Sequence, residues 1–219
     1  MRRAFRNNGL TIALMVLFAV SLLGQLLTGW RVENEDLARH GGSAVTLGSY
    51  MGGPAFLSTV FENWESEFLQ MATYVLLTAI LIQRGSAESK DPEDPPRDQD
   101  LRLKGMAPQA PPILHKGRLA RAIYSRSLGI ALTLLFLVSF TIHWTQSARV
   151  AAQEAIDHHE VPPTLLGYLV DPQLWFESFQ NWQSEFLSTA VLVVLTIFLR
   201  QRESPESKPV AAPHSQTGA

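Results

Sequence analysis

The chain contains no cysteine, and this absence excludes several classes of chemistry. A disulfide framework, a catalytic thiol and a thiolate-bound metal ion all need cysteine. Charged residues are also few, at 17% of the 219 residues, and the formal net charge is -2. Proteins that bind nucleic acid usually carry a clear excess of lysine and arginine. The charge balance therefore gives no reason to expect a nucleic-acid partner.

The sequence also lacks the signatures of common enzyme sites. It contains no Gly-x-Ser-x-Gly, no Walker sequence and no dinucleotide-binding glycine pattern. The run His158-His159-Glu160 could suggest a metal ion, but side chains of adjacent residues point apart on a helix or a strand. A solvated loop explains that run better. The sequence therefore predicts a protein that is not an enzyme and that holds no cofactor and no metal.

The most informative feature that is present is a motif that occurs twice. Residues 61–69 read FENWESEFL, and residues 179–187 read FQNWQSEFL. The second copy follows the first by 118 residues, and the same spacing brings the apolar run at 10–30 into register with the run at 128–144. The chain is therefore built from an internal repeat.

The apolar residues are gathered into four runs that polar stretches separate. The run 10–30 is long enough to span a bilayer, which needs about 20 helical residues. A signal peptide begins in the same way, but the matching internal run at 128–144 cannot be a cleaved leader. The charge-free runs at 68–82 and 186–199 are too short to span a bilayer alone. Fifteen helical residues rise only about 22 Å, and the hydrocarbon core is about 30 Å thick. Each of these spans must therefore include part of the motif before it.

These observations predict an all-α membrane protein with four transmembrane helices in two tandem two-helix repeats. The expected parts are a first hairpin repeat at 1–90, a proline-rich cytoplasmic linker at 91–123, a second hairpin repeat at 124–208 and a disordered tail at 209–219. Lysine and arginine gather in the N-terminus, linker and tail, which predicts that both termini are cytoplasmic at a bacterial inner membrane. Both repeats then share one orientation, with a pseudo-two-fold axis along the membrane normal. The expected partners are the lipid bilayer and, as a homo-oligomer, further copies of the chain.

Residues 61–69, followed by QRGSAESK at 83–90, resemble a family of uncharacterised bacterial integral membrane proteins. That family is classed as a domain of unknown function, and the resemblance covers nearly the whole chain. The second copy departs from the motif, because Gln180 and Gln183 replace Glu62 and Glu65. Those two acids are therefore poorer candidates for a symmetric role. The resemblance implies a membrane location and brings no catalytic residue with it.

Polar residues inside the predicted spans form the candidate site. Asn63 and Glu67 stand four residues apart, and therefore on one helix face, and the second copy keeps both. Gln25 and Glu67 are each expected about 22 Å from the inner surface, and His143 and Glu185 at comparable depths. Equal depth predicts that Gln25 pairs with Glu67 and His143 with Glu185. The predicted intramembrane cluster, facing the bundle interior, comprises Asn63, Glu67, Asn181, Glu185, Gln25 and His143. The predicted interface anchors are Trp30, Trp64, Trp144 and Trp182.

Two interpretations of the cluster stay open at this point. In the first, its members are interhelical hydrogen bonds worth about 0.6–2 kcal/mol each, and the protein has a structural, stress-related or assembly role. In the second, Glu67 and Glu185 face each other and share a proton or bind a cation. The segments at 55–62 and 174–180 also allow two placements: along the outer surface, or as a continuation of each spanning helix.

Overall fold

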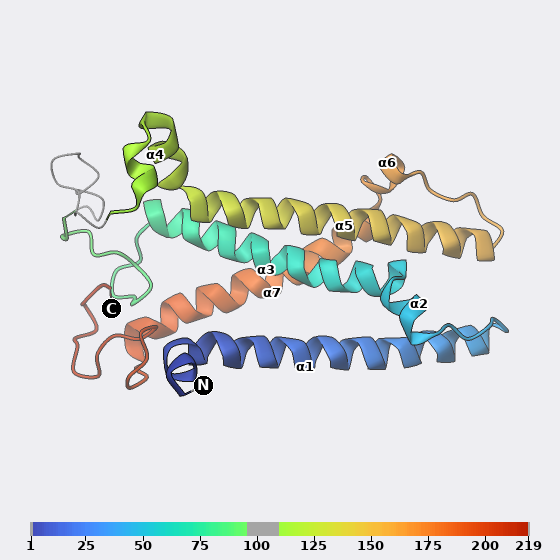
Figure 1. Cartoon of the computed structure of the whole chain (residues 1–219), viewed down its shortest axis with the longest axis horizontal. Helices are drawn as coiled ribbons and strands as arrows, with labels where there is room; N and C mark the ends of the chain where they lie inside the picture. The colour runs from blue at the N-terminus through green and yellow to red at the C-terminus, as the bar shows by residue number, and fades with distance from the viewer. Residues whose placement is uncertain (1, 96–109, 219) are drawn as a thin grey trace. The chain divides into compact units, whose positions relative to one another are not determined.

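The computed structural model describes residues 2–95 and 110–218, and in this part of the chain it consists of helices and loops (Figure 1). In chain order the elements are α1 (Arg2–Arg39), α2 (Leu47–Met51), α3 (Pro54–Ile80), the 3-10 helix η2 (Pro112–His115), α4 (Arg118–Tyr124), α5 (Ser127–Asp157), α6 (Leu165–Tyr168) and α7 (Pro172–Phe198). The described residues contain no strand, so the predicted all-α class is confirmed. Two of the helices, α1 over Asn7–Arg39 and α5, have the length and composition of membrane spans.

The chain divides into two compact units. The first unit comprises Met1–Phe61 and Ile142–Val170, and the second comprises Glu62–Thr141 and Asp171–Ala219. Helices α3 and α5 each contribute a segment to both units. The motif copies belong almost entirely to the second unit, so the contacts between them can be described there.

Helices α3 and α7 occupy the same places in the two repeats. Each begins at a proline, a residue that suits the first helical turn because its missing N–H needs no partner there. Each has 27 residues, about 40 Å of helix, and their first residues lie 118 apart. The first motif copy and the segment before it lie within α3, and the second copy and the segment before it lie within α7. Those segments therefore continue the helix, and their placement along or across a membrane stays a prediction.

The short helices α2 and α6 also correspond. Thr46 is the N-cap of α2, and its hydroxyl accepts a hydrogen bond from the Ser49 N–H at 3.2 Å. Thr164 lies 118 residues later and caps α6 in the same way, accepting from the Gly167 N–H at 3.0 Å. A threonine in an extended conformation satisfies one of the unpaired N–H groups at a helix start. The duplicated sequence therefore specifies a duplicated local structure.

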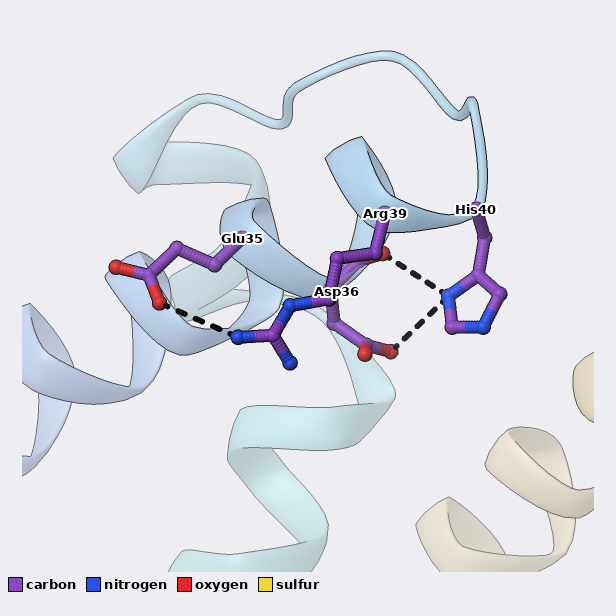
Figure 2. Close-up of polar contacts among 4 residues, drawn as sticks. All are labelled: Glu35, Asp36, Arg39 and His40. Atoms are coloured by element: carbon purple, nitrogen blue, oxygen red, sulfur yellow. Dashed lines mark hydrogen bonds and ion pairs between the residues drawn. The ribbon is translucent and has the colours of Figure 1, made fainter.

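The last turn of α1 is polar and solvated. Figure 2 shows Arg39 facing Glu35, with 3.9 Å between the charged atoms, and His40 contacting Asp36 through its ring Nδ1. The side chains of Arg39 and Glu35 are 71% and 69% exposed, so this ion pair adds little stability. After it the chain reverses at Gly41 (φ 73°), and the Gly42 N–H donates to the Leu37 carbonyl at 2.8 Å.

The predicted linker contains some helical structure. Within 110–123, η2 and the start of α4 pack together, and Arg121 Nε donates to the Leu114 carbonyl at 3.3 Å. The Leu114 side chain is buried. The prediction for residues 96–109 lies outside the described residues.

Candidate functional site

The two motif copies meet in the second unit, and Glu65 is at the centre of this contact. Its side chain is fully buried, at 0% exposure. Glu65 Oε1 accepts hydrogen bonds from the Ser178 hydroxyl at 2.8 Å and from the Trp182 indole N–H at 3.2 Å. A buried carboxylate is costly unless donors compensate for the lost water. The two donors from α7 supply that compensation, so Glu65 ties α3 to α7.

Glu62 makes a second bond of the same kind one turn earlier. Its Oε1 accepts from Asn181 Nδ2 at 2.6 Å, and the same nitrogen also donates to the Glu177 carbonyl of its own helix at 3.2 Å. We call the five side chains that join the copies the inter-copy contact: Glu62, Glu65, Ser178, Asn181 and Trp182. In this contact α3 supplies the acceptors and α7 supplies the donors.

Gln70 extends this contact toward the C-terminal ends of the two helices. Its Nε2 donates to the Glu185 carbonyl at 2.8 Å and to the Ser188 hydroxyl at 3.2 Å. Gln70 and Ser188 are 118 residues apart, so equivalent positions of the two copies touch each other. Such a contact is what two helices related by a local two-fold axis would make.

Trp182, one of the predicted anchors, also belongs to an aromatic group in the second unit. Its ring lies edge-on to Phe179 at 5.4 Å, to Phe136 at 6.3 Å and to Trp175 at 6.3 Å between centroids. Edge-to-face contacts of this kind favour a fixed ring orientation. The aromatic group therefore orients the indole N–H toward Glu65.

The members of the predicted polar cluster take different positions. Asn63 and Glu67 have exposed side chains on α3, and their place in the interior of a bundle stays a prediction. The buried face of α3 instead carries Ser58, Glu65 and Ala72, spaced seven residues apart. Residues at that spacing share a helix face. The inter-copy contact thus involves the glutamates that the second copy replaces.

The other predicted cluster members differ in burial and in partners. Glu185 is half-buried, and in the second unit it lies near enough to Glu67 for the two charges to act on each other. In the first unit, Gln25 donates to the Thr59 hydroxyl at 3.4 Å, and His143 is fully buried. The predicted Gln25–Glu67 and His143–Glu185 pairs join the two units and stay predictions.

Two of the predicted tryptophan anchors hold loops within the first unit. Trp30 Nε1 donates to the Val45 carbonyl at 2.7 Å, and Trp144 Nε1 donates to the Leu165 carbonyl at 3.0 Å. Asn34 reinforces the first loop, because it accepts from the Val45 N–H at 2.7 Å and donates back to its carbonyl at 3.1 Å. Trp64 is half-buried. A location of these rings at a membrane interface stays a prediction.

Tyr50 packs beneath the same loop of the first unit. Its ring lies 5.5 Å from that of Phe56, and its hydroxyl occupies the space where a Cβ on Gly29 would stand. Burial raises the pKa of the Tyr50 phenol, and the charge of Glu33 raises it further. Glycine at position 29 therefore allows α1 and α2 to approach closely.

A second duplicated structure follows each long helix. We call residues 83–90 (QRGSAESK) the first serine loop and residues 201–208 (QRESPESK) the second serine loop. In the first loop the Gln83 N–H donates to the Ser89 hydroxyl at 3.0 Å. In the second loop the Gln201 N–H donates to the Ser207 hydroxyl at 2.9 Å. Serine hydroxyls thus close both turns by bonding the backbone.

Lys208, at the end of the second serine loop, connects that loop to the first. The ammonium is almost fully buried and donates to the carbonyls of Gly85, His214 and Gln216, the last two at 3.0 and 2.9 Å. Burial lowers the pKa of the Lys208 ammonium, and the charge of Arg200 lowers it further. Carbonyl oxygens, and no carboxylate, surround this cation in the described part of the chain.

The C-terminal segment also bonds the first serine loop. The Gly85 N–H donates to the Thr217 hydroxyl at 2.9 Å, and the Gly218 N–H donates to the Ser86 carbonyl at 2.9 Å. These bonds involve residues within 209–218, and the disordered tail that the sequence predicts at 209–219 stays a prediction. The polar composition of this segment is explained by its hydrogen bonds to the loop.

Comparison with known families identifies the chain. Residues 1–219 match the model of one family, a domain of unknown function (DUF6766). The chain belongs to this family. No curated protein and no solved structure matches the chain. The resemblance that the motif indicates is confirmed at this level, as membership of a domain of unknown function.

Sequence reasoning missed the residues that make most of these contacts in this DUF6766 chain. The sequence makes Glu62 and Glu65 poorer candidates for a symmetric role, because the second copy does not keep them. Their spacing of three, which places them on one helix face with Ser58, was the signal that could have indicated a buried face. The second serine loop could also have been found, because QRESPESK repeats QRGSAESK at the same spacing of 118.

Proposed function

We propose that the chain is a multi-pass protein of the bacterial inner membrane with a non-enzymatic role in structure or assembly. In this proposal α1, α3, α5 and α7 span the bilayer as two tandem hairpins. Both termini and the linker lie in the cytoplasm, and the inter-copy contact holds the second helices of the hairpins together.

The observation that carries the proposal is the distribution of apolar and polar side chains. Large apolar side chains are exposed on every face of α1. Consecutive residues of a helix point about 100° apart, so an exposed run of them covers the whole circumference. Five of them in succession are exposed: Leu14, Met15, Val16, Leu17 and Phe18. None of the most apolar stretch of α1 is buried, which is not expected for the core helix of a water-soluble protein.

Many buried positions on the long helices are polar, although Phe56, Val60, Leu132 and Leu174 are buried as well. Small hydroxyl side chains are buried on three of the long helices: Ser58, Ser66, Ser139, Ser147, Ser178 and Thr196. Ser58 and Ser147 in the first unit contact each other through their hydroxyls at 2.6 Å. Small polar residues at helix–helix contacts, with apolar residues outside, are typical of membrane bundles. This inverted distribution supports lipid as the surrounding medium.

The proposed role follows from what the motif side chains contact. Glu62 and Glu65 both accept hydrogen bonds from the partner helix. Side chains engaged in this way hold helices in one register, as polar groups do in membrane bundles. The motif is therefore assigned to assembly of the bundle.

Labelling of single cysteines tests the membrane topology, since the native chain has none. Ser43→Cys and Val161→Cys should react with a membrane-impermeant maleimide on intact spheroplasts. Asp94→Cys and Ser215→Cys should react only after permeabilisation. Labelling of residue 94 on intact spheroplasts would overturn the proposal. So would recovery of the four single-cysteine variants in the soluble fraction, with all four labelled equally.

A proton or cation pathway is the second candidate function. It is favoured by one observation: Glu67 and Glu185, on α3 and α7, lie near enough for their charges to act on each other. A carboxylate near a like charge holds its proton more strongly. The purified chain in liposomes should then carry proton or cation flux that the Glu67→Gln/Glu185→Gln double variant abolishes. Equal flux through both proteins removes this candidate.

A further inference from the structure

A cavity of about 340 Å³ lies within the second unit, bounded by α3, α7 and the first serine loop. This volume is in the range of small-molecule sites. Most of its wall is apolar, with Leu77, Leu81, Phe186 and Val193 among the lining residues. Glu88 lies at the end formed by the serine loop. The cavity therefore combines a hydrocarbon wall with one acidic group.

The Glu88 carboxylate has one satisfied oxygen and one without a donor. Its Oε2 accepts a hydrogen bond from the Tyr74 hydroxyl at 2.7 Å. Its Oε1 is buried, and no group in the described part of the chain donates to it. A buried acceptor left without a donor costs free energy. A ligand that brings an N–H donor to this point would recover that cost.

The charge near Glu88 is not balanced by an ion pair in the described residues. The closest cation in the loop sequence, Lys90, directs its ammonium to the Ala79 carbonyl at 2.6 Å. Glu206, the equivalent of Glu88 in the second serine loop, does not belong to the lining of this cavity. The acidic end of the cavity therefore favours a cation over a neutral or anionic ligand.

We propose that this cavity binds a primary alkylammonium group. The ammonium donates to the Glu88 carboxylate, and the attached hydrocarbon chain lies against Leu77, Leu81 and Phe186. The ammonium has three N–H donors, so water or Gln83 at the loop end can take the others. The ligand is either a free alkylamine or the ammonium headgroup of an aminophospholipid, which share this chemistry.

The second repeat does not offer the same site. Leu192 stands where Tyr74 stands in the first repeat, and Glu206 is exposed. The carboxylate there has neither the phenol beside it nor the burial. One site for each chain is therefore expected, and Glu206 provides a matched control for loss of the same charge.

Isothermal titration of the full chain in phosphatidylcholine nanodiscs, with empty nanodiscs as the blank, tests the proposal. The probe is n-hexylammonium, and n-hexanol is its neutral counterpart. The native chain should bind one hexylammonium and should not bind hexanol measurably. Glu88→Gln should weaken hexylammonium binding at least tenfold, whereas Glu206→Gln should change it less than twofold.

A second variant separates loss of the ligand contact from misfolding. Ala190→Phe fills the cavity and leaves Glu88 in place, so it should also abolish binding. The proposal is overturned if the native chain does not bind, or if Glu88→Gln or Ala190→Phe binds as tightly as the native chain. Nanodiscs containing phosphatidylethanolamine identify the source: competition with hexylammonium indicates the lipid headgroup, and unchanged affinity indicates a free amine.

Discussion

The two copies of the motif have the same helix boundaries and opposite roles. Glu65 of the first copy is fully buried and accepts two hydrogen bonds from α7. Gln183, at the same position of the second copy, is exposed and donates to the Gln180 carbonyl of its own helix at 3.1 Å. Duplication therefore preserved the helix, while substitution made the first copy the acceptor and the second copy the donor.

The difference extends to the residues around these positions. Ser178, which donates to Glu65, corresponds to the buried Val60 in the first copy. A valine cannot return the hydrogen bond, so a symmetric exchange between the copies is impossible at this point. An acid retained at position 183 would have no hydroxyl facing it from position 60. Glutamine at that position leaves no charge that needs a partner.

The largest expected effect separates Glu65 from Gln183. Glu65→Ala should reduce the free energy of unfolding by about 3 kcal/mol, because two buried donors lose their acceptor. Gln183→Ala should change it by less than about 0.5 kcal/mol, as surface substitutions usually do. Reversible unfolding in mixed micelles measures both values. Equal losses for the two variants would refute the asymmetry.

The serine loops allow the same comparison at Lys208 and Lys90. Lys208→Met leaves one buried and two part-buried carbonyls without this donor and should cost about 2 kcal/mol, whereas Lys90→Met releases only the Ala79 carbonyl. Hydrogen exchange at Gly85 and Gly218 should accelerate in Lys208→Met, since the C-terminal segment loses its attachment. Protection that survives in this variant would show that Lys208 does not hold the segment.

Residues 85 and 203 should respond in opposite directions. Both adopt a positive φ, 83° at Gly85 and 68° at Glu203. A Cβ on residue 85 would lie 2.8 Å from the His214 carbonyl, so Gly85→Ala should cost about 1–2 kcal/mol. Glu203→Gly should raise the stability by up to about 1 kcal/mol, because glycine adopts this conformation without strain. Thermal unfolding of the two variants gives the signs, and a loss at both positions would contradict the comparison.

The smallest effect should be the same in both repeats. Thr46→Ala and Thr164→Ala each remove one N-cap hydrogen bond, worth about 1 kcal/mol in a typical helix. Amide exchange at Ser49 and Gly167 should increase by similar factors. A change at one position only would mean that the loops before α3 and α7 are not equivalent.

The elements of the fold were predictable because they depend on local pattern. Proline at 54 and 172, and apolar runs in register at a spacing of 118, are visible in the sequence. The face that each helix buries was not predictable, because one residue of rotation turns a helix by about 100°. Asn63 and Glu67 lie close to Glu62, Glu65 and Ser66 along the chain. Only the packing of α7 decides which of these side chains are buried. The hydrogen bonds of the C-terminal segment could not be predicted from local pattern either, since Lys208 donates to the carbonyl of Gly85, 123 residues away.

Cross-linking of Gln70→Cys with Ser188→Cys tests the central claim most directly, that α3 and α7 meet through equivalent positions. Membranes are treated with a short bifunctional thiosulfonate, and a protease then cuts the linker at a site inserted at residue 100. The two halves should remain joined on a non-reducing gel, whereas the control pair Gln70→Cys with Gln183→Cys should separate. Separation of the first pair, or a cross-link that forms only between two chains, would contradict the account.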